Sequence, residues 1–321
     1  MEIREIPLEK LNADAFIREQ VEAVRAAVGG GIAVNALSGG VDSSVVTMIA
    51  HRALGDRLKS YFVENGIMRA GEPQQILTWF KELGVPVTLV DAKGEFFAAL
   101  RGLTDPEEKR EAITQTFYRK VFARLVRESG AQFLLQGTNY TDVEETVAKV
   151  KRQHNVLEQL GIDTQEAFGY KVLEPILALR KPAVRLVGKA LGLPEAIFGR
   201  PPFPGPALAA RVLGEVTPER TETVRQATRI VEEELAGTPA FQYLAILHET
   251  KVTGIRNGRR DYGQQIEVRC WESQDAVTGT ATRLPWDVLE RLARRITTEV
   301  PNVVSVTYGI TPKPPSTIEA V

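Results

Sequence analysis

The stretch that decides the fold is Ala33 to Thr47, with the sequence AVNALSGGVDSSVVT. The apolar run that ends at Leu37 predicts a buried parallel strand, and the apolar-rich segment from Ser44 to Leu54 predicts a helix. A glycine-rich turn between a strand and a helix presents backbone N–H groups and the positive end of the helix to an anion. We therefore expect residues 38 to 44 to bind phosphate groups.

The side chains of this turn suit a phosphate and a metal ion. Ser38, Ser43 and Ser44 supply hydroxyl groups, and the glycines between them let the backbone approach a ligand closely. Asp42 supplies a carboxylate, and Mg²⁺ takes carboxylate and phosphate oxygens as ligands. No lysine follows the glycines, so the turn is not the common P-loop. An ordinary strand-to-helix turn with a capping serine is the alternative interpretation.

Composition and charge predict a soluble, cytoplasmic, globular enzyme. Hydrophobic residues make up 43% of the 321-residue chain and charged residues 25%, which is typical of globular proteins. The net charge of -1 gives no reason to expect a nucleic-acid or membrane partner. The N-terminal segment lacks an apolar signal core, and no run of about 18 apolar residues occurs. The single cysteine, Cys270, cannot form an internal disulfide.

Strands and helices alternate through residue 190, which predicts an α/β fold with a doubly wound parallel sheet and helices on both faces. The expected strands are 33–37, 58–63, 85–90, 133–135 and 172–176, and expected helices include 13–29, 76–83 and 182–191. Ligands of such sheets bind at the carboxyl ends of the strands. The segments FVENGIMR at 62–69 and QGTN at 136–139 follow two of these strands, so we expect them beside a nucleotide.

A proline-rich segment marks a domain boundary. Four of the first six residues of the segment Pro201 to Arg211 are prolines, which excludes a helix there. We expect one domain at residues 1–200 and a small α+β domain with an antiparallel sheet at residues 201–321. The expected elements of the second domain are helices at 217–235 and 286–298 and strands at 245–247, 266–271 and 303–308.

Residues 142 to 170 are polar and irregular in pattern. Lys149, Lys151, Arg152 and His154 lie close together within this segment. A lid that closes over phosphate groups is one interpretation, and an exposed helix is the other.

The motif LSGGVDSS at 37–44 resembles the pyrophosphate loop of the N-type ATP pyrophosphatases, which have an adenine nucleotide alpha hydrolase-like fold. Further segments extend the resemblance along the chain: FVENGIMR, GEP at Gly71, TDPEEKR, QGT at Gln136, KVKRQHNV, LEP at Leu173, PFPGPALAAR, LGEVTPE and KPPSTIE at Lys313. With them, the whole chain resembles the GMP synthase family, specifically its ATP pyrophosphatase domain followed by its dimerisation domain. The resemblance is to the two-subunit form, in which the glutaminase is a separate chain.

The resemblance implies a ligase reaction. ATP would adenylate the 2-oxo group of XMP, pyrophosphate would leave, and ammonia from the separate glutaminase subunit would displace AMP to give GMP. A carbonyl oxygen is a poor leaving group, and the attached AMP makes it a good one. The implied cofactors are ATP and Mg²⁺, and the implied assembly is a homodimer.

The resemblance also assigns residues by their positions in the motifs. The ATP-binding residues would be Ser38, Gly39, Gly40, Val41, Asp42, Ser43, Ser44, Val63, Ile67 and Gly137. Asp42 would also hold the metal, and the lid residues Lys149, Lys151 and His154 would share the catalytic role with it. XMP would contact Arg110, Gln242, Lys313 and Glu319.

Departures from the family pattern fall in the substrate half of the chain. Gln153 stands where the family has a histidine, Gly258 where it has an aspartate, and SQDAVTG at 273–279 where it has SxDGMTA. These differences leave open a paralogue that adenylates another purine-like or heterocyclic carbonyl for amidation or sulfur insertion, the latter through Cys270. A nucleotide-binding regulatory protein without catalysis is the third hypothesis.

Overall fold

The computed structural model describes residues 4–147, 170–198, 203–274 and 277–320. The chain forms two compact units. The first contains Met1–Glu64, Glu72–Asp91 and Phe117–Arg200, and the second contains Asn65–Gly71, Ala92–Thr116 and Pro201–Val321. Among the described residues, no helix is long and apolar enough to span a membrane.

The first unit is built on a five-stranded sheet with the order β3-β2-β1-β4-β5. Its strands are β1 (Ala33–Ala36), β2 (Leu58–Glu64), β3 (Val87–Asp91), β4 (Phe133–Leu135) and β5 (Lys171–Leu173). Every pairing is parallel, and Ala33 of β1 is paired with Leu58 on one side and Phe133 on the other. The strand order reverses between β1 and β4, which is where open sheets bind ligands. The predicted doubly wound sheet is confirmed.

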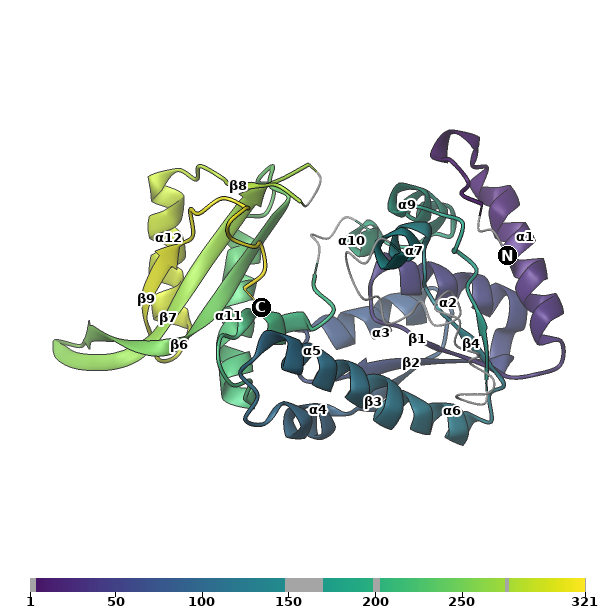
Figure 1. The fold of residues 1–321 in the computed structure, drawn as a ribbon, viewed down its shortest axis with the longest axis horizontal. Helices are drawn as coiled ribbons and strands as arrows, with labels where there is room; N and C mark the ends of the chain where they lie inside the picture. Colours follow the sequence, from purple (N-terminus) through teal and green to yellow (C-terminus); the bar gives the residue numbers. More distant parts are fainter. Residues whose placement is uncertain (1–3, 148–169, 199–202, 275–276, 321) are drawn as a thin grey trace. The chain divides into compact units, whose positions relative to one another are not determined.

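Helices cover both faces of this sheet (Figure 1). They are α1 (Ala13–Val28), α2 (Val41–Leu54), α3 (Glu72–Glu82), α6 (Ala123–Ser129), α7 (Tyr140–Val147), α9 (Lys181–Ala190) and α10 (Glu195–Phe198). Short 3-10 turns occur at Leu8–Lys10 and Gly55–Arg57, and a π-helical segment at Thr116–Phe122 precedes α6. Helices α1, α2 and α9 pack against one another, whereas α6 lies on the opposite side of the sheet (Figure 1).

Helix α2 is the central helix of the first unit. Val45, Val46 and Ile49 are at most 1% exposed, which explains why its sequence is apolar on nearly every side. The helix begins at Val41, three residues before the predicted start at Ser44. Gly40 is its N-cap and has no side chain that could accept from the first turn, and the Ser43 hydroxyl donates to the Gly40 carbonyl at 3.1 Å. Asp42 and Ser43 therefore lie in the first helical turn rather than in a loop.

The second unit contains a four-stranded sheet with helices packed on it. Its strands are β6 (Gln242–Arg256), β7 (Arg259–Glu272), β8 (Thr280–Ala281) and β9 (Val303–Tyr308). Its helices are α4 (Lys93–Leu100), α5 (Pro106–Gln115), α11 (Pro218–Glu234) and α12 (Trp286–Glu299), with a 3-10 helix at Ala207–Arg211. Helices α11 and α12 pack side by side, α11 against β6 and α12 against β9 (Figure 1).

The expectation of an antiparallel sheet is confirmed for β6, β7 and β8 and wrong for β9. β6 and β8 run antiparallel to β7, but β9 runs parallel to it. The physical reason is the crossover: α12 lies between β8 and β9 in the chain, and a helical connection of this length can return the chain to a parallel pairing. β6 and β7 are also much longer than the strands expected at 245–247 and 266–271.

The turn between β6 and β7 explains one departure from the family pattern. Asn257 and Gly258 connect the two strands, with φ values of 52° and 72°. Two-residue hairpin turns of this kind require positive φ at both positions, which Asn-Gly adopts readily. Gly258 is thus a turn residue, and the nearby Asp261 pairs with Arg256 at 3.2 Å.

Candidate functional site

The predicted phosphate loop, residues 38–44, lies at the carboxyl end of β1, where the strand order reverses. The hydroxyls of Ser38 and Ser43 share a hydrogen bond of 2.9 Å, and the Ser38 N–H donates to the Ser43 hydroxyl at 3.2 Å. Gly39 has a φ of +81°, and a Cβ at this position would meet Ile76 Cδ1 at 2.9 Å. Only glycine fits this backbone without strain. The predicted loop residues are thus brought together at the N-terminus of α2.

Asp42 lies in the first turn of α2, and only one of its two carboxylate oxygens has a partner among the described residues. Its Oδ2 forms an ion pair with the Lys181 ammonium of α9. Its Oδ1 is buried and has no hydrogen-bond partner among the described residues. A buried carboxylate oxygen without a partner is costly, and a ligand that coordinates it would remove that cost. The hydroxyl of Ser44 in the same turn is also buried without a partner among those residues.

The donor set fits a magnesium ion that shares its ligands with a phosphate. Among the described residues, no three His, Cys, Asp or Glu side chains are grouped to hold a metal by themselves. Mg²⁺ is commonly held by one or two carboxylates together with substrate phosphates and water. Asp42, with its unpartnered Oδ1 beside the phosphate loop, provides the one carboxylate that such a site needs.

Gly137 lies where β4 meets α2. A Cβ at this position would lie 3.1 Å from both the Asp42 carbonyl carbon and the Ser43 nitrogen. The glycine therefore lets the end of β4 approach the first turn of α2. After it, the Asn139 side chain accepts from the Thr141 N–H at 3.0 Å and begins α7.

Two of the remaining residues predicted to bind ATP lie in different units, and the lid residues lie outside the described part of the chain. Val63 is buried in β2 of the first unit, and Ile67 is buried in the second unit. Lys149, Lys151 and His154 lie outside the described residues, so the lid hypothesis stays a prediction.

Two of the predicted substrate contacts meet in the second unit. Glu319 accepts a hydrogen bond of 2.5 Å from the Gln242 side chain. Glu319 also accepts from Arg211, at 3.2 Å from Nε and 3.1 Å from Nη2. Arg211 is only 1% exposed, and its Nη1 has no partner among the described residues. Its guanidinium lies 4.8 Å from the centre of the Phe203 ring.

Arg211, which contacts the predicted substrate residue Glu319, was not among the residues predicted from the sequence. It ends the PFPGPALAAR motif, which marks the expected domain boundary and contributes to the family resemblance, but no role was assigned to this arginine. A conspicuous arginine at the end of a proline-rich motif was the available signal, but its partner Glu319 lies 108 residues away in the sequence.

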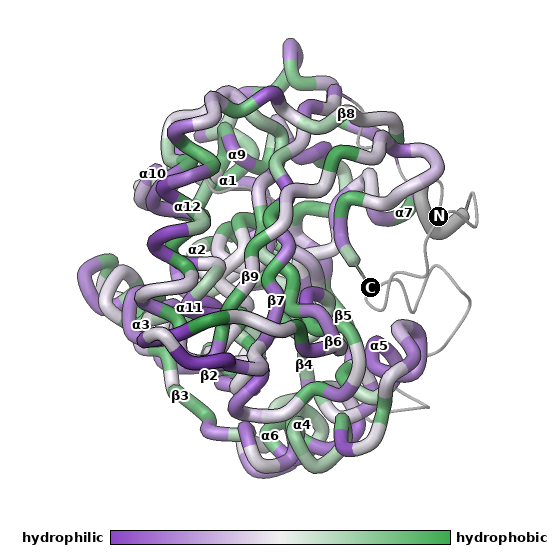
Figure 2. The backbone as a smooth tube through the Cα atoms, turned by 90° about the vertical axis from the view of Figure 1, so that its left-hand side faces the viewer, coloured by the Kyte–Doolittle hydropathy of each residue, from purple (hydrophilic) through white to green (hydrophobic). Residues whose placement is uncertain are grey.

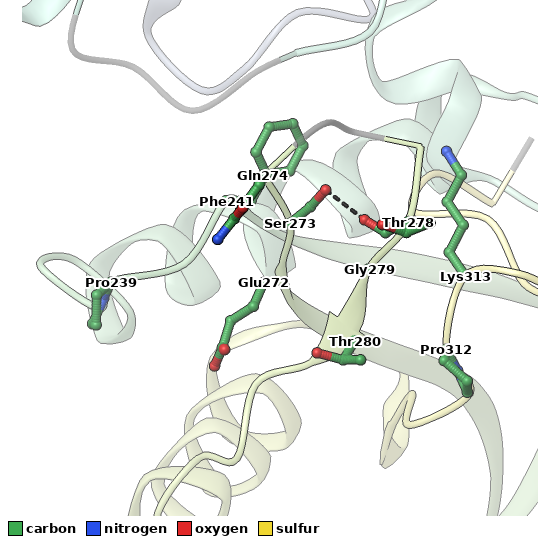
Figure 3. Close-up of a pocket in the computed structure, with 10 residues that line it drawn as sticks. All are labelled: Pro239, Phe241, Glu272, Ser273, Gln274, Thr278, Gly279, Thr280, Pro312 and Lys313. Atoms are coloured by element: carbon green, nitrogen blue, oxygen red, sulfur yellow. Dashed lines mark hydrogen bonds between the residues drawn. The ribbon is translucent and has the colours of Figure 1, made fainter.

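Lys313 lies beside a hollow of about 550 Å³ in the second unit. Its backbone forms an antiparallel bridge with Gly279, with hydrogen bonds of 3.0 and 2.9 Å. The hollow is lined by Pro239, Phe241, Glu272, Ser273, Gln274, Thr278, Gly279, Thr280, Pro312 and Lys313 (Figure 3). The Ser273 hydroxyl donates to the Thr278 carbonyl at 2.6 Å (Figure 3). Four residues of the SQDAVTG segment, which departs from the family pattern, therefore form part of this wall: Ser273, Gln274, Thr278 and Gly279.

Arg110 lies on α5, a largely hydrophilic helix (Figure 2), and pairs with Glu107 at 3.7 Å. The preceding residue, Lys109, is only 1% exposed and donates to the Val212 carbonyl at 2.9 Å. Burial lowers the pKa of Lys109 to about 8, and the positive charge of Arg220 contributes to this lowering. Lys109 thus anchors the helix that carries Arg110.

Comparison with known proteins defines the class first. The family model for NAD synthase matches residues 11–127, and the model for the GMP synthase C terminal domain matches residues 228–320. Together with the parallel sheet and the SGGVDS loop, these matches define an α/β protein of the ATP pyrophosphatase class with a small C-terminal domain. A solved NH3-dependent NAD synthetase from Campylobacter jejuni aligns with a TM-score of 0.46 and 15% identity, over 59% of this chain and 77% of that one.

Full-length relatives then identify the family. The chain is 47% identical over 309 residues to the B subunit of the glutamine-hydrolyzing GMP synthase of Pyrococcus furiosus, covering 95% of this chain and 97% of that protein. The corresponding B subunit of Archaeoglobus fulgidus is 47% identical over 96% of this chain and 99% of its own length. The glutamine-hydrolyzing GMP synthase of Symbiobacterium thermophilum is 45% identical over 95% of this chain, which spans 60% of that protein. The chain belongs to the family of GMP synthase B subunits.

Proposed function

We infer that this chain catalyses the ATP-dependent amidation of XMP to GMP. The observation that carries this conclusion is the 47% identity to the B subunit of a GMP synthase over 97% of the length of that subunit. The phosphate loop at the switch point of the sheet supplies the ATP-binding part of the reaction. ATP is therefore a substrate of this chain.

The loop residues would act on the β and γ phosphates of ATP. The N–H groups at the start of α2 and the hydroxyls of Ser38 and Ser43 would donate to phosphate oxygens, and Gly39 and Gly40 keep the approach open. Asp42 would hold Mg²⁺ through its unpartnered oxygen. When bound, Mg²⁺ neutralises charge on the phosphates and on the departing pyrophosphate. Catalysis would then depend on position and electrostatic stabilisation, without a protein nucleophile.

We propose that XMP binds to the second unit. Lys313 and Arg110 carry the positive charge suited to a 5′-phosphate, and Gln242 and Glu319 provide polar groups for the base and ribose. The Arg211 guanidinium supports this assignment, because it holds the Glu319 carboxylate in place. The 2-oxo oxygen of XMP would be adenylated, and ammonia would then displace AMP.

The partners follow from the same assignment. We propose that a separate glutaminase subunit supplies the ammonia and that the chain forms a homodimer through residues 201–321. The long β6–β7 hairpin supports the dimer, since Ile255 and Tyr262 on it are 81% and 64% exposed. We also propose a domain boundary at residue 200 and a cytoplasmic location. The proposed lid contains Lys149, Lys151 and His154.

The paralogue that inserts sulfur through Cys270 is disfavoured. Cys270 is fully buried in β7, and burial raises the pKa of its thiol. Reactive cysteines usually have a lowered pKa and are partly exposed. Cys270 therefore acts as a small apolar residue of the core.

The test is a direct assay of the purified chain. ATP, Mg²⁺, XMP and ammonium at alkaline pH should give GMP and AMP in equal amounts without the glutaminase. IMP and related nucleotides in place of XMP test the paralogue hypothesis. If XMP gives neither GMP nor AMP and another nucleotide gives AMP, that nucleotide is the substrate instead of XMP. Absence of AMP with every nucleotide would contradict the proposed enzyme.

A further inference from the structure

The C-terminal segment, residues 313–320, carries two of the proposed XMP contacts and packs on one face of strands β6 and β7. Its Ile318 is buried in an apolar cluster with Leu244 and Ile246 of β6 and Trp271 of β7. Hydrophobic burial is non-directional, so this cluster keeps the segment on the sheet without fixing the orientation of its polar groups.

A charged pair lies on the same face as this apolar cluster. Leu244 is paired with Arg269 and Ile246 with Glu267, and residues paired across two strands point to the same side of the sheet. Arg269 Nε donates to Glu267 Oε1 at 2.6 Å, and the two side chains are only 14% and 15% exposed. Withdrawing both charges from water is costly, and packing of the segment does not require it. The pair therefore points to a directional role.

The guanidinium of Arg269 holds the backbone of the C-terminal segment. Its Nη1 donates to the Thr317 carbonyl at 2.8 Å and to the Ile318 carbonyl at 3.2 Å. These are the two carbonyls that immediately precede Glu319. Because the guanidinium is planar and its Nε is bound to Glu267, the direction of the Nη1 bonds is fixed relative to β7.

Glu267 is itself held in place through both carboxylate oxygens. Its Oε1 accepts from Arg269, and its Oε2 shares a hydrogen bond of 3.0 Å with His248 Nε2. Burial would raise the pKa of the Glu267 carboxyl, but the bonds from Arg269 and His248 outweigh burial and lower it. A Cβ at Gly309, just after β9, would lie 2.5 Å from Oε1, so this glycine leaves the space that the carboxylate occupies.

We propose that Arg269 is a positioning residue for XMP, which places Glu319 for contact with the nucleotide by holding the two backbone carbonyls before it. This inference rests on the proposed function, in which Glu319 contacts XMP. Arg269 acts through the backbone and does not touch the substrate. Without it, the contacts of Ile318 would keep the segment on the sheet, but XMP would have to order Glu319 on binding, and this ordering would weaken the affinity.

Steady-state kinetics of the full-length chain test the proposal. GMP formation from ATP, XMP and ammonium gives the KM for XMP and kcat, and calorimetry in the presence of Mg²⁺ gives the affinity for the α,β-methylene analogue of ATP. The test variant is Arg269→Met. The matched control is Arg291→Met, since Arg291 of α12 also donates to two carboxylates, at 2.6 Å to Asp287 and at 3.2 Å to Glu234 of α11.

The loss of the charged hydrogen bonds to the two carbonyls predicts a KM for XMP that is about 10- to 100-fold higher in Arg269→Met. Its kcat at saturating XMP and its affinity for the ATP analogue should stay as in wild type, as should all three quantities in Arg291→Met. Arg269→Lys should fall between, because one ammonium lacks the planar fork that reaches the carboxylate and the carbonyls together. Should Arg269→Met fail to fold, Arg269→Lys carries the comparison.

A double variant tests whether Arg269 acts through Glu319. Arg269→Met combined with Glu319→Gln should raise the KM for XMP no further than Glu319→Gln alone, because the positioned carboxylate is already lost. Effects that multiply independently would reject the route through Glu319.

Two further results would overturn the proposal in different ways. An unchanged KM for XMP in the folded Arg269 variants, or an equal loss of affinity for the ATP analogue, would reject the role of Arg269 and leave the proposed function intact. Failure of the wild-type chain to form GMP from XMP would reject the proposed function and this inference with it.

Discussion

Replacing Glu319 with glutamine tests the ion pair that organises the proposed substrate region. Arg211 is 1% exposed and donates to the Glu319 carboxylate at 3.1 and 3.2 Å, and Gln242 donates to it at 2.5 Å. Glu319→Gln keeps the size of the side chain but removes its negative charge. The Arg211 guanidinium would then stay buried without a counter-charge. Burying this unpaired charge would lower the free energy of unfolding.

The geometry sets the size of this effect. Removing one partner of a fully buried ion pair costs about 3–5 kcal/mol. The Glu319 side chain is 20% exposed, so water would compensate for part of the loss. The Arg211 hydrogen bonds are also longer than the roughly 2.8 Å usual between charged groups. We therefore expect Glu319→Gln to lower the free energy of unfolding by about 2 kcal/mol, measured by urea denaturation.

An exposed pair provides the control. Glu22 of α1 pairs with Arg25, and its side chain is 70% exposed, so Glu22→Gln should cost less than about 0.5 kcal/mol. In a double-mutant cycle, Arg211→Met combined with Glu319→Gln should cost clearly less than the sum of the single changes. Additive costs, or a Glu319→Gln effect no larger than that of Glu22→Gln, would show that the Arg211–Glu319 ion pair does not stabilise the fold.

Three further predictions concern the loop, α5 and the C-terminal segment. Gly39→Ala should lower the free energy of unfolding by about 1–3 kcal/mol in urea denaturation, because Gly39 has a φ of +81° and the added Cβ would contact Ile76. Gly30→Ala should not lower it, because a Cβ at Gly30 would meet nothing within 4 Å. Equal effects of the two substitutions would contradict this prediction. Burial disfavours the charged form of Lys109, so between pH 8 and 10.5 the folded state binds fewer protons than the unfolded state. The free energy of unfolding of wild type should therefore rise through this window by up to about 3 kcal/mol relative to that of Lys109→Met. A difference between the two proteins that stays constant with pH would contradict the lowered pKa. Deletion of residues 313–321 should abolish GMP formation but spare binding of the ATP analogue, and unchanged turnover would show that Lys313 and Glu319 are dispensable.

Much of the first unit could be predicted because its signals are local. The apolar run before Ser38 and the glycines after it specify a strand, a turn and a helix within fifteen residues, and the alternation of elements specifies a parallel sheet. The start of α2 at Val41 was missed, because its N-cap is Gly40, which has no side chain to accept from the first turn and therefore gives no capping signal in the sequence.

The long-range contacts of the site could not be predicted from local pattern. Lys181 reaches Asp42 across 139 residues, and Arg211 reaches Glu319 across 108. Both pairs depend on which elements the fold brings together, and neither lysine nor arginine has a distinctive local spacing. The parallel pairing of β9 was missed for a similar reason, since strand direction depends on the path of α12 rather than on the residues of the strand.

In the reaction proposed for this chain, the 2-oxo oxygen of XMP is activated by attachment to AMP. The most direct test is a turnover with XMP labelled with oxygen-18 at that position, followed by mass spectrometry of the products. Adenylation of XMP predicts that the label appears in AMP and is absent from GMP and pyrophosphate. Formation of GMP with unlabelled AMP, and with the label in phosphate or water, would contradict adenylation of the substrate.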